Sequence, residues 1–181
     1  MESGKLKSNE KLVVRSARKS DARYFVHLVR ELAAYEKLEP PGVSETRKLV
    51  RDGFGKNRRY SLLMAFRGEE AVGYCVYFMT YSTFLARPTL YVEDIFVSAD
   101  ERRSGVGSRM FLKIIDIAAK KGCGRIEWMV LNWNEPAISF YDGMGAQALD
   151  GWRHYRLDEK QFKPASAAIA AKHEISISGA R

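Results

Sequence analysis

Residues 91–108 read YVEDIFVSADERRSGVGS, and this stretch decides the fold. The stretch begins within a largely apolar run from Leu90 to Val97. Pro88 precedes this run and the polar Ser98-Ala99-Asp100 follows it, so the run predicts a strand. After the glycine-bearing loop, apolar residues predict a long helix from about Ser108 to Lys121. They cover more than one helical face, so we expect this helix to lie against a sheet with little exposure.

The loop between that strand and that helix fits an anion. Glycines let the backbone approach a ligand, and the free N–H groups of a first helical turn bind phosphates. A dinucleotide fingerprint needs a third glycine where Met110 stands, and a P-loop needs Lys where Ser108 stands. Both known motifs fail, and the loop by itself fits a plain helix start equally well.

The rest of the chain surrounds this unit with strands and helices. Alternation, caps and Gly or Pro breaks predict the order βαα-βββ-α-β-α-β, a mixed α+β layout around one sheet. We expect strands at 12–15, 60–66, 72–81, 90–97, 126–131 and 152–157, and helices that start at Ser20-Asp21, Ser44-Glu45, about Ser108 and Asn134-Glu135-Pro136.

The length of 181 residues is most simply one domain. We expect a flexible N-terminus at 1–10, a folded domain at 11–163 and a tail at 164–181, Ala/Ser-rich and either disordered or a loosely docked helix. The N-terminus has no apolar segment typical of a secretory signal. Two isolated cysteines exclude a disulfide framework and favour a reducing, cytoplasmic location, and three histidines without ligand spacing predict no metal site.

The charge is strongly basic. The formal net charge is +8, and most of it lies in the body of the chain. Such a body suits nucleic acid, a membrane surface or a phosphorylated cofactor, or simply keeps the protein soluble. No helix-turn-helix or RNA-binding signature is present, and the longest uncharged run, Ala71 to Ala86, is too short to span a membrane. We therefore predict neither a nucleic-acid partner nor a membrane partner.

The glycine loop resembles the acetyl-CoA loop of the GNAT superfamily of N-acetyltransferases. It has the pattern Arg-x-x-Gly-x-Gly and follows a strand that ends in Glu-Asp-Ile-Phe-Val. Further motifs are similar to the spermidine/spermine (diamine) N-acetyltransferase family: Glu31-Leu32-Ala33-Ala34-Tyr35-Glu36, Asp52-Gly53-Phe54-Gly55, Tyr91 to Val97, Trp133-Asn134-Glu135-Pro136 and Phe140 to Ala146. The resemblance, from about Val13 to Leu157, implies a GNAT fold with a mostly antiparallel twisted sheet, helices on both faces, acetyl-CoA as co-substrate and a homodimer.

The same resemblance implies the cofactor contacts. The strand backbone would bind the pantetheine arm, the loop would bind the diphosphate, and the start of the following helix would contact the other side of the cofactor. The residues concerned are Ile95, Phe96, Val97, Arg102, Arg103, Ser104, Gly105, Val106, Gly107, Ser108, Asn134, Glu135, Pro136 and Ala137. Ala137 stands where some family members carry serine, so one side-chain hydrogen bond is absent.

Acetyl transfer requires an ammonium to lose a proton and a thiolate to gain one. By resemblance, Glu93 assists the first and Tyr141 the second. Desolvation in an apolar strand should raise the pKa of Glu93, and alternation should turn Asp94 to the opposite face, where it is structural. Glu93 also fits an exposed carboxylate or a structural ion pair, and Tyr141 also fits an ordinary core aromatic.

The resemblance further implies an amine site lined by Tyr35, Glu36, Glu93, Glu127, Trp128 and Met129, although the last three also fit ordinary strand and core packing. A cationic substrate on a basic protein needs a local negative pocket, which we expect from Glu31, Glu36, Glu39 and Glu93.

The substrate class follows from the segment 81–88. Polyamine-acetylating relatives carry an aspartate there, whereas this chain has Ser82, Thr83 and Arg87, groups suited to a carboxylate or an amino group. The chain thus looks like the relatives that prefer thialysine, ornithine or other short diamino substrates. A protein or peptide N-acetyltransferase and a non-catalytic acyl-CoA-binding module remain alternatives.

Overall fold

A computed structural model describes residues 10–173 of the chain. The chain divides after Leu131 into two compact units, and each is described by itself. The first unit holds β1 (Leu12–Ser16), η2 (Lys19–Asp21), α1 (Ala22–Glu36), α2 (Val43–Phe54), β2 (Ser61–Arg67), β3 (Glu70–Ser82), β4 (Arg87–Val97), η3 (Ala99–Glu101), α3 (Val106–Lys120) and β5 (Arg125–Trp128). The second unit holds α4 (Glu135–Gly143) and α5 (Glu159–His173).

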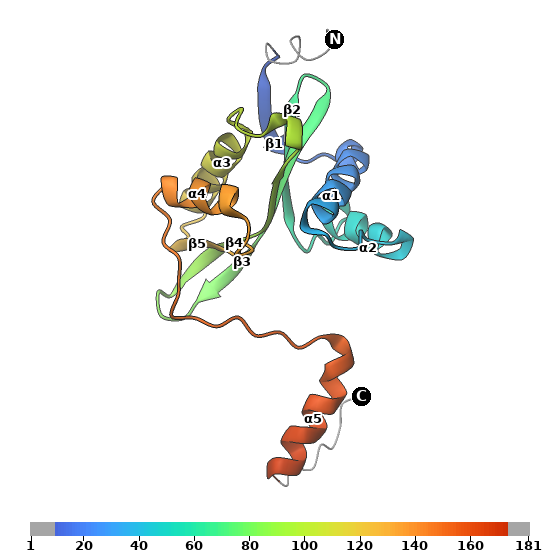
Figure 1. Cartoon of the computed structure of the whole chain (residues 1–181), viewed down its shortest axis with the longest axis vertical. Helices are drawn as coiled ribbons and strands as arrows, with labels where there is room; N and C mark the ends of the chain where they lie inside the picture. The colour runs from blue at the N-terminus through green and yellow to red at the C-terminus, as the bar shows by residue number, and fades with distance from the viewer. Residues whose placement is uncertain (1–9, 174–181) are drawn as a thin grey trace. The chain divides into compact units, whose positions relative to one another are not determined.

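The first unit is built on one five-stranded sheet in the order β1-β2-β3-β4-β5 (Figure 1). All neighbouring pairs are antiparallel except β4 and β5, which are parallel because α3 crosses over between them. The α+β class, the mostly antiparallel sheet and the helices on both of its faces are therefore confirmed.

Each face of the sheet carries its own apolar core. In β2, Leu63 and Ala65 point toward Met110 and Ile114 of α3. The intervening residues of the same strand point toward Phe25 and other side chains of α1 and α2. Strand alternation thus divides one apolar run between two helical layers, and α1 and α2 lie on the opposite side of the sheet from α3 (Figure 1).

Two helices differ from their predicted form. Asp21 precedes α1 but does not cap it, because its carboxylate accepts hydrogen bonds from Arg15 and from the Arg18 N–H. In α3 the apolar stripe is wider than the buried face, and Leu112 and Ile115 stay 65% and 47% exposed. The expectation that α3 has little exposure is therefore wrong for its outer face.

The predicted strand at 152–157 is also wrong, because the described residues contain no strand there. Trp152 and Tyr155 remain 81% and 82% exposed. A strand needs a neighbour that satisfies its backbone, and residues 132–173 of the second unit contain no other strand. From residue 164 onward the helical alternative is confirmed up to His173, although α5 begins earlier, at Glu159, and runs through Pro164. Residues 1–9 of the predicted flexible N-terminus and residues 174–181 of the predicted tail lie outside the described residues.

Candidate acetyl-transfer site

The pairing of β4 with β5 stops halfway along β4. The last matched pair is Val92 with Trp128, where β5 ends, whereas β4 continues to Val97 and stays paired with β3 on its other side. The backbone of Glu93–Val97 therefore has no strand neighbour on the β5 side among residues 10–173. Backbone groups without a strand neighbour are satisfied by side chains, water or a ligand: Arg102 reaches the Val97 carbonyl, and the pantetheine contacts predicted for Ile95, Phe96 and Val97 would use this edge.

A β-bulge lies where this unpaired half begins. Val76 is opposite Asp94 and Tyr77 is opposite Val92, so Glu93 is the extra residue without a partner in β3. The bulge interrupts the alternation that the sequence suggested. Glu93 is exposed rather than desolvated, which corrects the expected burial, and it lies close enough to Asp94 for the two carboxyl groups to interact.

Asp94, the residue after Glu93, has a largely buried carboxyl group with a raised pKa. Desolvation, followed by repulsion from Glu93 and Glu36, raises the pKa of Asp94 to about 6. The sequence analysis expected Asp94 to be structural and did not predict this raised pKa. Burial also raises the pKa of Glu36, the last residue of α1 and a predicted amine-site residue.

A buried phenol adjoins this acidic group. Tyr74 is completely buried, and its hydroxyl lies beside the Asp94 carboxyl without completing a hydrogen bond to any residue in the range 10–173. Burial, with the charges of Asp94 and Glu36, raises the pKa of Tyr74 well above its ordinary value. Because this hydroxyl has no access to solvent, it belongs to the buried core behind Asp94.

The predicted site residues of β5 lie along the paired half of β4. Glu127 is opposite Tyr91 and forms an ion pair with Arg125 at 2.8 Å. Burial raises the pKa of Tyr91, and the charges of Glu93 and Glu127 raise it further. Trp128 packs edge-on against Phe111 of α3, with ring centroids 5.0 Å apart. Met129 follows β5 and is 55% exposed. Trp128 therefore packs against α3, whereas Glu127 is one of the acids beside Tyr91.

Two acids of the expected set, Glu31 and Glu39, are not among those that act on the pKa of Asp94. Glu31 accepts a hydrogen bond from Ser98 Oγ at 3.0 Å and pairs with His27, and no contact joins it to Asp94. Glu39 lies beyond the end of α1. The acids that the structure gathers around Tyr74 and Tyr91 are Glu36, Glu93, Asp94 and Glu127.

The glycine loop opens onto the N-terminus of α3. Gly105 is the N-cap residue at φ +84°, a conformation that glycine adopts without strain, and no side chain caps the helix there. The first turn contains Val106, Gly107 and Ser108, and its N–H groups point out of the helix without intrahelical partners. This geometry fits the diphosphate that the sequence analysis assigned to the loop.

Arg102 connects the loop to the amine-site residues. Its guanidinium lies 4.2 Å from the ring centroid of Tyr35 and 5.8 Å from that of Phe96, and its Nε donates to the Val97 carbonyl at 3.2 Å. The structure thus brings Tyr35 and Arg102 together, although the sequence analysis had assigned them to different ligands.

The remaining predicted residues belong to the second unit. Asn134 is the N-cap of α4, its carbonyl accepts the N–H groups of Ala137 and Ile138, and Glu135 and Pro136 form the first turn. Tyr141 is buried, with its ring centroid 5.5 Å from that of Phe140. The proximity of these residues to the first unit stays a prediction.

The predicted recognition of a substrate carboxylate at 82–87 finds no support. Ser82 is buried and accepts the Leu85 N–H within the hairpin, and Arg87 donates to the Gly122 carbonyl at 3.1 Å. Arg87 is also six residues from Glu93 along β4, roughly 20 Å at the rise of a strand. Ser82 thus holds the β3–β4 turn, and Arg87 ties the start of β4 to the turn after α3.

Residues 10–173 contain neither a metal-binding cluster nor a membrane-crossing helix. No group of three or more His, Cys, Asp or Glu side chains in it is arranged to hold a metal ion. In the same part, no helix combines the length and the apolar character that crossing a membrane requires.

Comparisons with known proteins agree with this geometry. The family model described as acetyltransferase (GNAT) family matches residues 24–146. Thialysine N-epsilon-acetyltransferase of Bos taurus is 35% identical over 163 residues, which are 84% of this chain and 95% of the relative. L-ornithine N5-acetyltransferase of Arabidopsis thaliana is 44% identical over 85 residues, 47% of this chain and 37% of the relative. Among solved structures, an integron cassette protein of V. cholerae matches with a TM-score of 0.73 at 19% identity, covering 86% of this chain and 97% of that one.

Proposed function

This chain belongs to the acetyltransferase (GNAT) family, and we propose that it transfers the acetyl group of acetyl-CoA to a primary amine of a small diamine or diamino acid. Acetyl transfer to an amine follows from the family and its relatives. The finer assignment depends on one observation. Four acids, Glu36, Glu93, Asp94 and Glu127, act on groups at the start of the unpaired half of β4, and the loop that follows this half leads to an uncapped helix N-terminus.

The residues of the first unit fit acetyl-CoA. The open N–H groups of the first turn of α3 would bind the diphosphate, and the backbone of Ile95, Phe96 and Val97 would bind the pantetheine arm. Acetyl-CoA supplies an activated thioester. A strand N–H that donates to the thioester carbonyl would stabilise the negative charge that develops there during attack.

The acidic group suits a cationic amine. Glu36, Glu93, Asp94 and Glu127 provide negative charge within a basic protein, so an ammonium group is attracted locally although the net charge opposes it. Glu93 is the exposed member and would accept a proton from the amine, directly or through water. Asp94, with its raised pKa, would hold or exchange a proton beside it.

Acetyl transfer forms one bond to nitrogen and breaks one bond to sulfur. The neutral amine nitrogen attacks the thioester carbonyl carbon, a C–N bond forms, and the C–S bond breaks with its electron pair on sulfur. The nitrogen loses its surplus proton toward Glu93. Tyr141 donates its phenolic proton to the thiolate and is reprotonated from solvent, so the products are an amide and a thiol.

The amine is best sought among short diamino compounds. Support comes from the relatives, which are named for thialysine and for ornithine. The four acids lie around one stretch of β4 and the adjacent end of α1, whereas a long polyamine needs acids distributed along its whole length.

Location and assembly form part of the same proposal. Cys75 and Cys123 are free thiols, in keeping with a reducing cytoplasm. A homodimer would cover exposed aromatic surface such as Trp152 and Tyr155. Light scattering after size exclusion measures the mass directly, and a monomer at micromolar concentration would contradict the dimer.

A thiol-release assay with thialysine, ornithine, putrescine, spermine and a lysine peptide tests the proposal. We expect kcat/KM to be highest for thialysine or ornithine, and mass spectrometry to find one added acetyl group. A clear preference for spermine or for the peptide would overturn the substrate class. Binding of acetyl-CoA without turnover of any amine would favour a non-catalytic module. Unchanged turnover in Tyr141→Phe would overturn the role of the phenol.

A further inference from the structure

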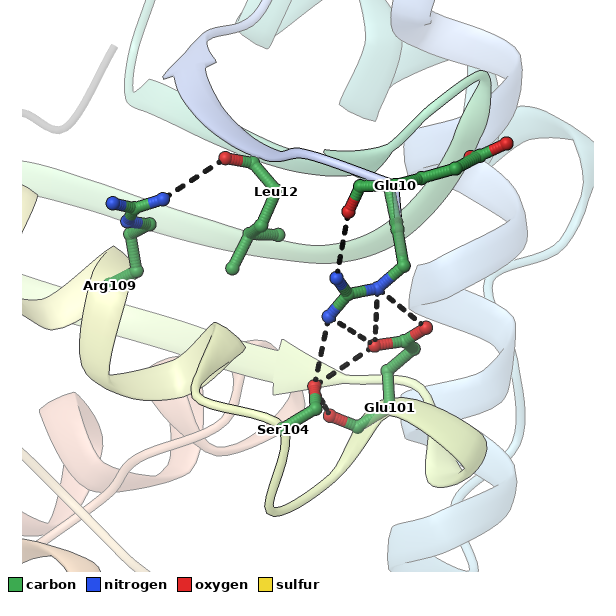
Figure 2. Close-up of polar contacts among 6 residues, drawn as sticks. Glu10, Leu12, Glu101, Ser104 and Arg109 are labelled. Carbon is green, nitrogen blue, oxygen red and sulfur yellow. Dashed lines mark hydrogen bonds and ion pairs between the residues drawn. The ribbon is translucent and has the colours of Figure 1, made fainter. Parts of the chain in front are cut away.

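An ion pair between β2 and the residue before the glycine loop is shielded from solvent. Arg67, the last residue of β2, donates from Nε and Nη2 to both carboxylate oxygens of Glu101 at 2.9–3.0 Å (Figure 2). The two side chains are 11% and 14% exposed. A two-pronged, shielded guanidinium–carboxylate contact is among the strongest and most directional of protein hydrogen bonds.

The same pair holds the loop itself. Ser104 Oγ lies 2.9 Å from Glu101 Oε2, 2.7 Å from the Glu101 carbonyl and 3.3 Å from Arg67 Nη2 (Figure 2). Arg67 Nη1 also donates to the Glu10 carbonyl. Arg67 thus ties the loop to the sheet and to the chain just before β1.

The loop needs such a restraint because its backbone is unusual. Arg103 has φ +62° and Gly105 has φ +84°, so the two neighbours of Ser104 both adopt the left-handed region. Arg103 has a side chain, and a left-handed conformation is unfavourable for such a residue unless its surroundings hold it in place. Ser104 is the residue that Glu101 and Arg67 fix between them.

We propose that Arg67 and Glu101 are positioning residues that hold the glycine loop in the shape that binds the diphosphate of acetyl-CoA. This inference rests on the proposed function. Neither side chain needs to touch the cofactor. The pair fixes Ser104, Ser104 fixes the two left-handed residues, and these orient the N–H groups that open onto the start of α3.

The test compares two acetyl donors, acetyl-CoA and S-acetylpantetheine, of which only the first contains the diphosphate. In Arg67→Gln we expect the KM for acetyl-CoA to rise about tenfold or more, equivalent to about 1.4 kcal/mol. The KM for the amine and the kcat/KM with S-acetylpantetheine should equal those of the wild type. Arg67→Lys, which keeps the charge but not the fork, should give an intermediate KM, as should Ser104→Ala.

A matched control separates positioning from general stability. Arg15 and Asp21 form another partly buried two-pronged ion pair on the same sheet, at 2.6 and 3.1 Å. Arg15→Gln should lower Tm as Arg67→Gln does, without a change in the KM for acetyl-CoA. If Arg67→Gln does not fold, Glu101→Gln and Arg67→Lys carry the same comparison.

The outcomes are distinct. Equal losses with both donors, or an unchanged KM for acetyl-CoA in a folded Arg67 or Glu101 variant, would overturn the positioning role while leaving the proposed function intact. A wild-type protein that neither binds nor consumes acetyl-CoA would overturn the proposed function, and the positioning role with it.

Discussion

The two halves of β4 share one strand and one neighbour, β3, but only the first half also has β5 beside it. In that closed half, Thr89, Leu90 and Val92 are at most 2% exposed. In the open half, Glu93 is exposed and Asp94 is partly exposed. Charged residues and the unpaired edge of β4 thus occur together, where the pairing with β5 stops. Only at such an edge can a ligand take the place of the missing strand.

Removing the acid at the start of the open half should have the largest effect. Glu93→Gln cannot accept a proton from the amine, so we expect kcat to fall roughly 100-fold or more. Steady-state thiol release with the best amine measures it. The control is Glu69→Gln in the exposed β2–β3 turn, which should keep its kcat. A Glu93→Gln enzyme with wild-type kcat would show that the open half carries no proton acceptor at this position.

Filling the space beneath the open half should destabilise the fold. A Cβ at Gly73, which pairs with Val97, would lie 2.7 Å from the Phe96 carbonyl oxygen and 3.2 Å from Met110 Cε. Because one of these atoms is backbone, Gly73→Ala should lower the free energy of unfolding by about 1–3 kcal/mol. Urea denaturation measures it. Gly143→Ala, where a Cβ meets no described atom within 4 Å, should be near neutral. Equal effects would refute the tight packing.

The raised pKa of Asp94 predicts a pH dependence of stability. The folded state favours the protonated carboxyl, so this contribution is fully present below pH 4 and is lost as the pH rises through about 6. Asp94→Asn has no charge to bury, and its gain over the wild type should grow from pH 4 to 7 and reach about 3 kcal/mol. Denaturation at several pH values measures this gain.

The control is Asp116, whose pKa is lowered rather than raised in the folded protein. The hydrogen bond from Lys120 lowers the pKa of Asp116, so Asp116→Asn should lose stability above pH 4 and match the wild type in stronger acid. A flat difference between Asp94→Asn and the wild type would contradict the burial of Asp94.

The smallest effect is expected at the other end of β4. Arg87→Gln removes a hydrogen bond to the Gly122 carbonyl but no substrate contact, so the KM for ornithine should stay unchanged. Initial-rate measurements over a range of ornithine concentrations test it. A marked rise in that KM, without a rise for putrescine, would restore Arg87 as the partner of a substrate carboxylate and weaken the distinction between the two halves.

Local patterns predicted most of the fold. Apolar alternation at 60–66 and 72–81 and the glycine loop before α3 correspond to β2, β3 and the open helix N-terminus. The strand at 152–157 failed because the described part of its unit, residues 132–173, contains no strand with which it could pair. A pattern within a segment says nothing of whether a partner exists for it.

The site was harder to predict for a similar reason. The bulge at Glu93 shifts the alternation by one residue, so a period of two assigned burial to Glu93 and no role to Asp94. A register shift depends on the opposite strand, and its position is not encoded in β4 alone. Arg67 and Glu101 are 34 residues apart and meet only through the sheet topology, so no local motif reveals their contact.

Amide hydrogen exchange with and without acetyl-CoA tests the central claim most directly. We predict protection on ligand addition at Glu93–Val97 and at Arg103–Ser108, with no change at Thr89–Val92, whose amides already lie between two strands. Protection confined to other segments, or no protection at saturating acetyl-CoA, would contradict the assignment of the open half of β4 and the glycine loop as the cofactor site.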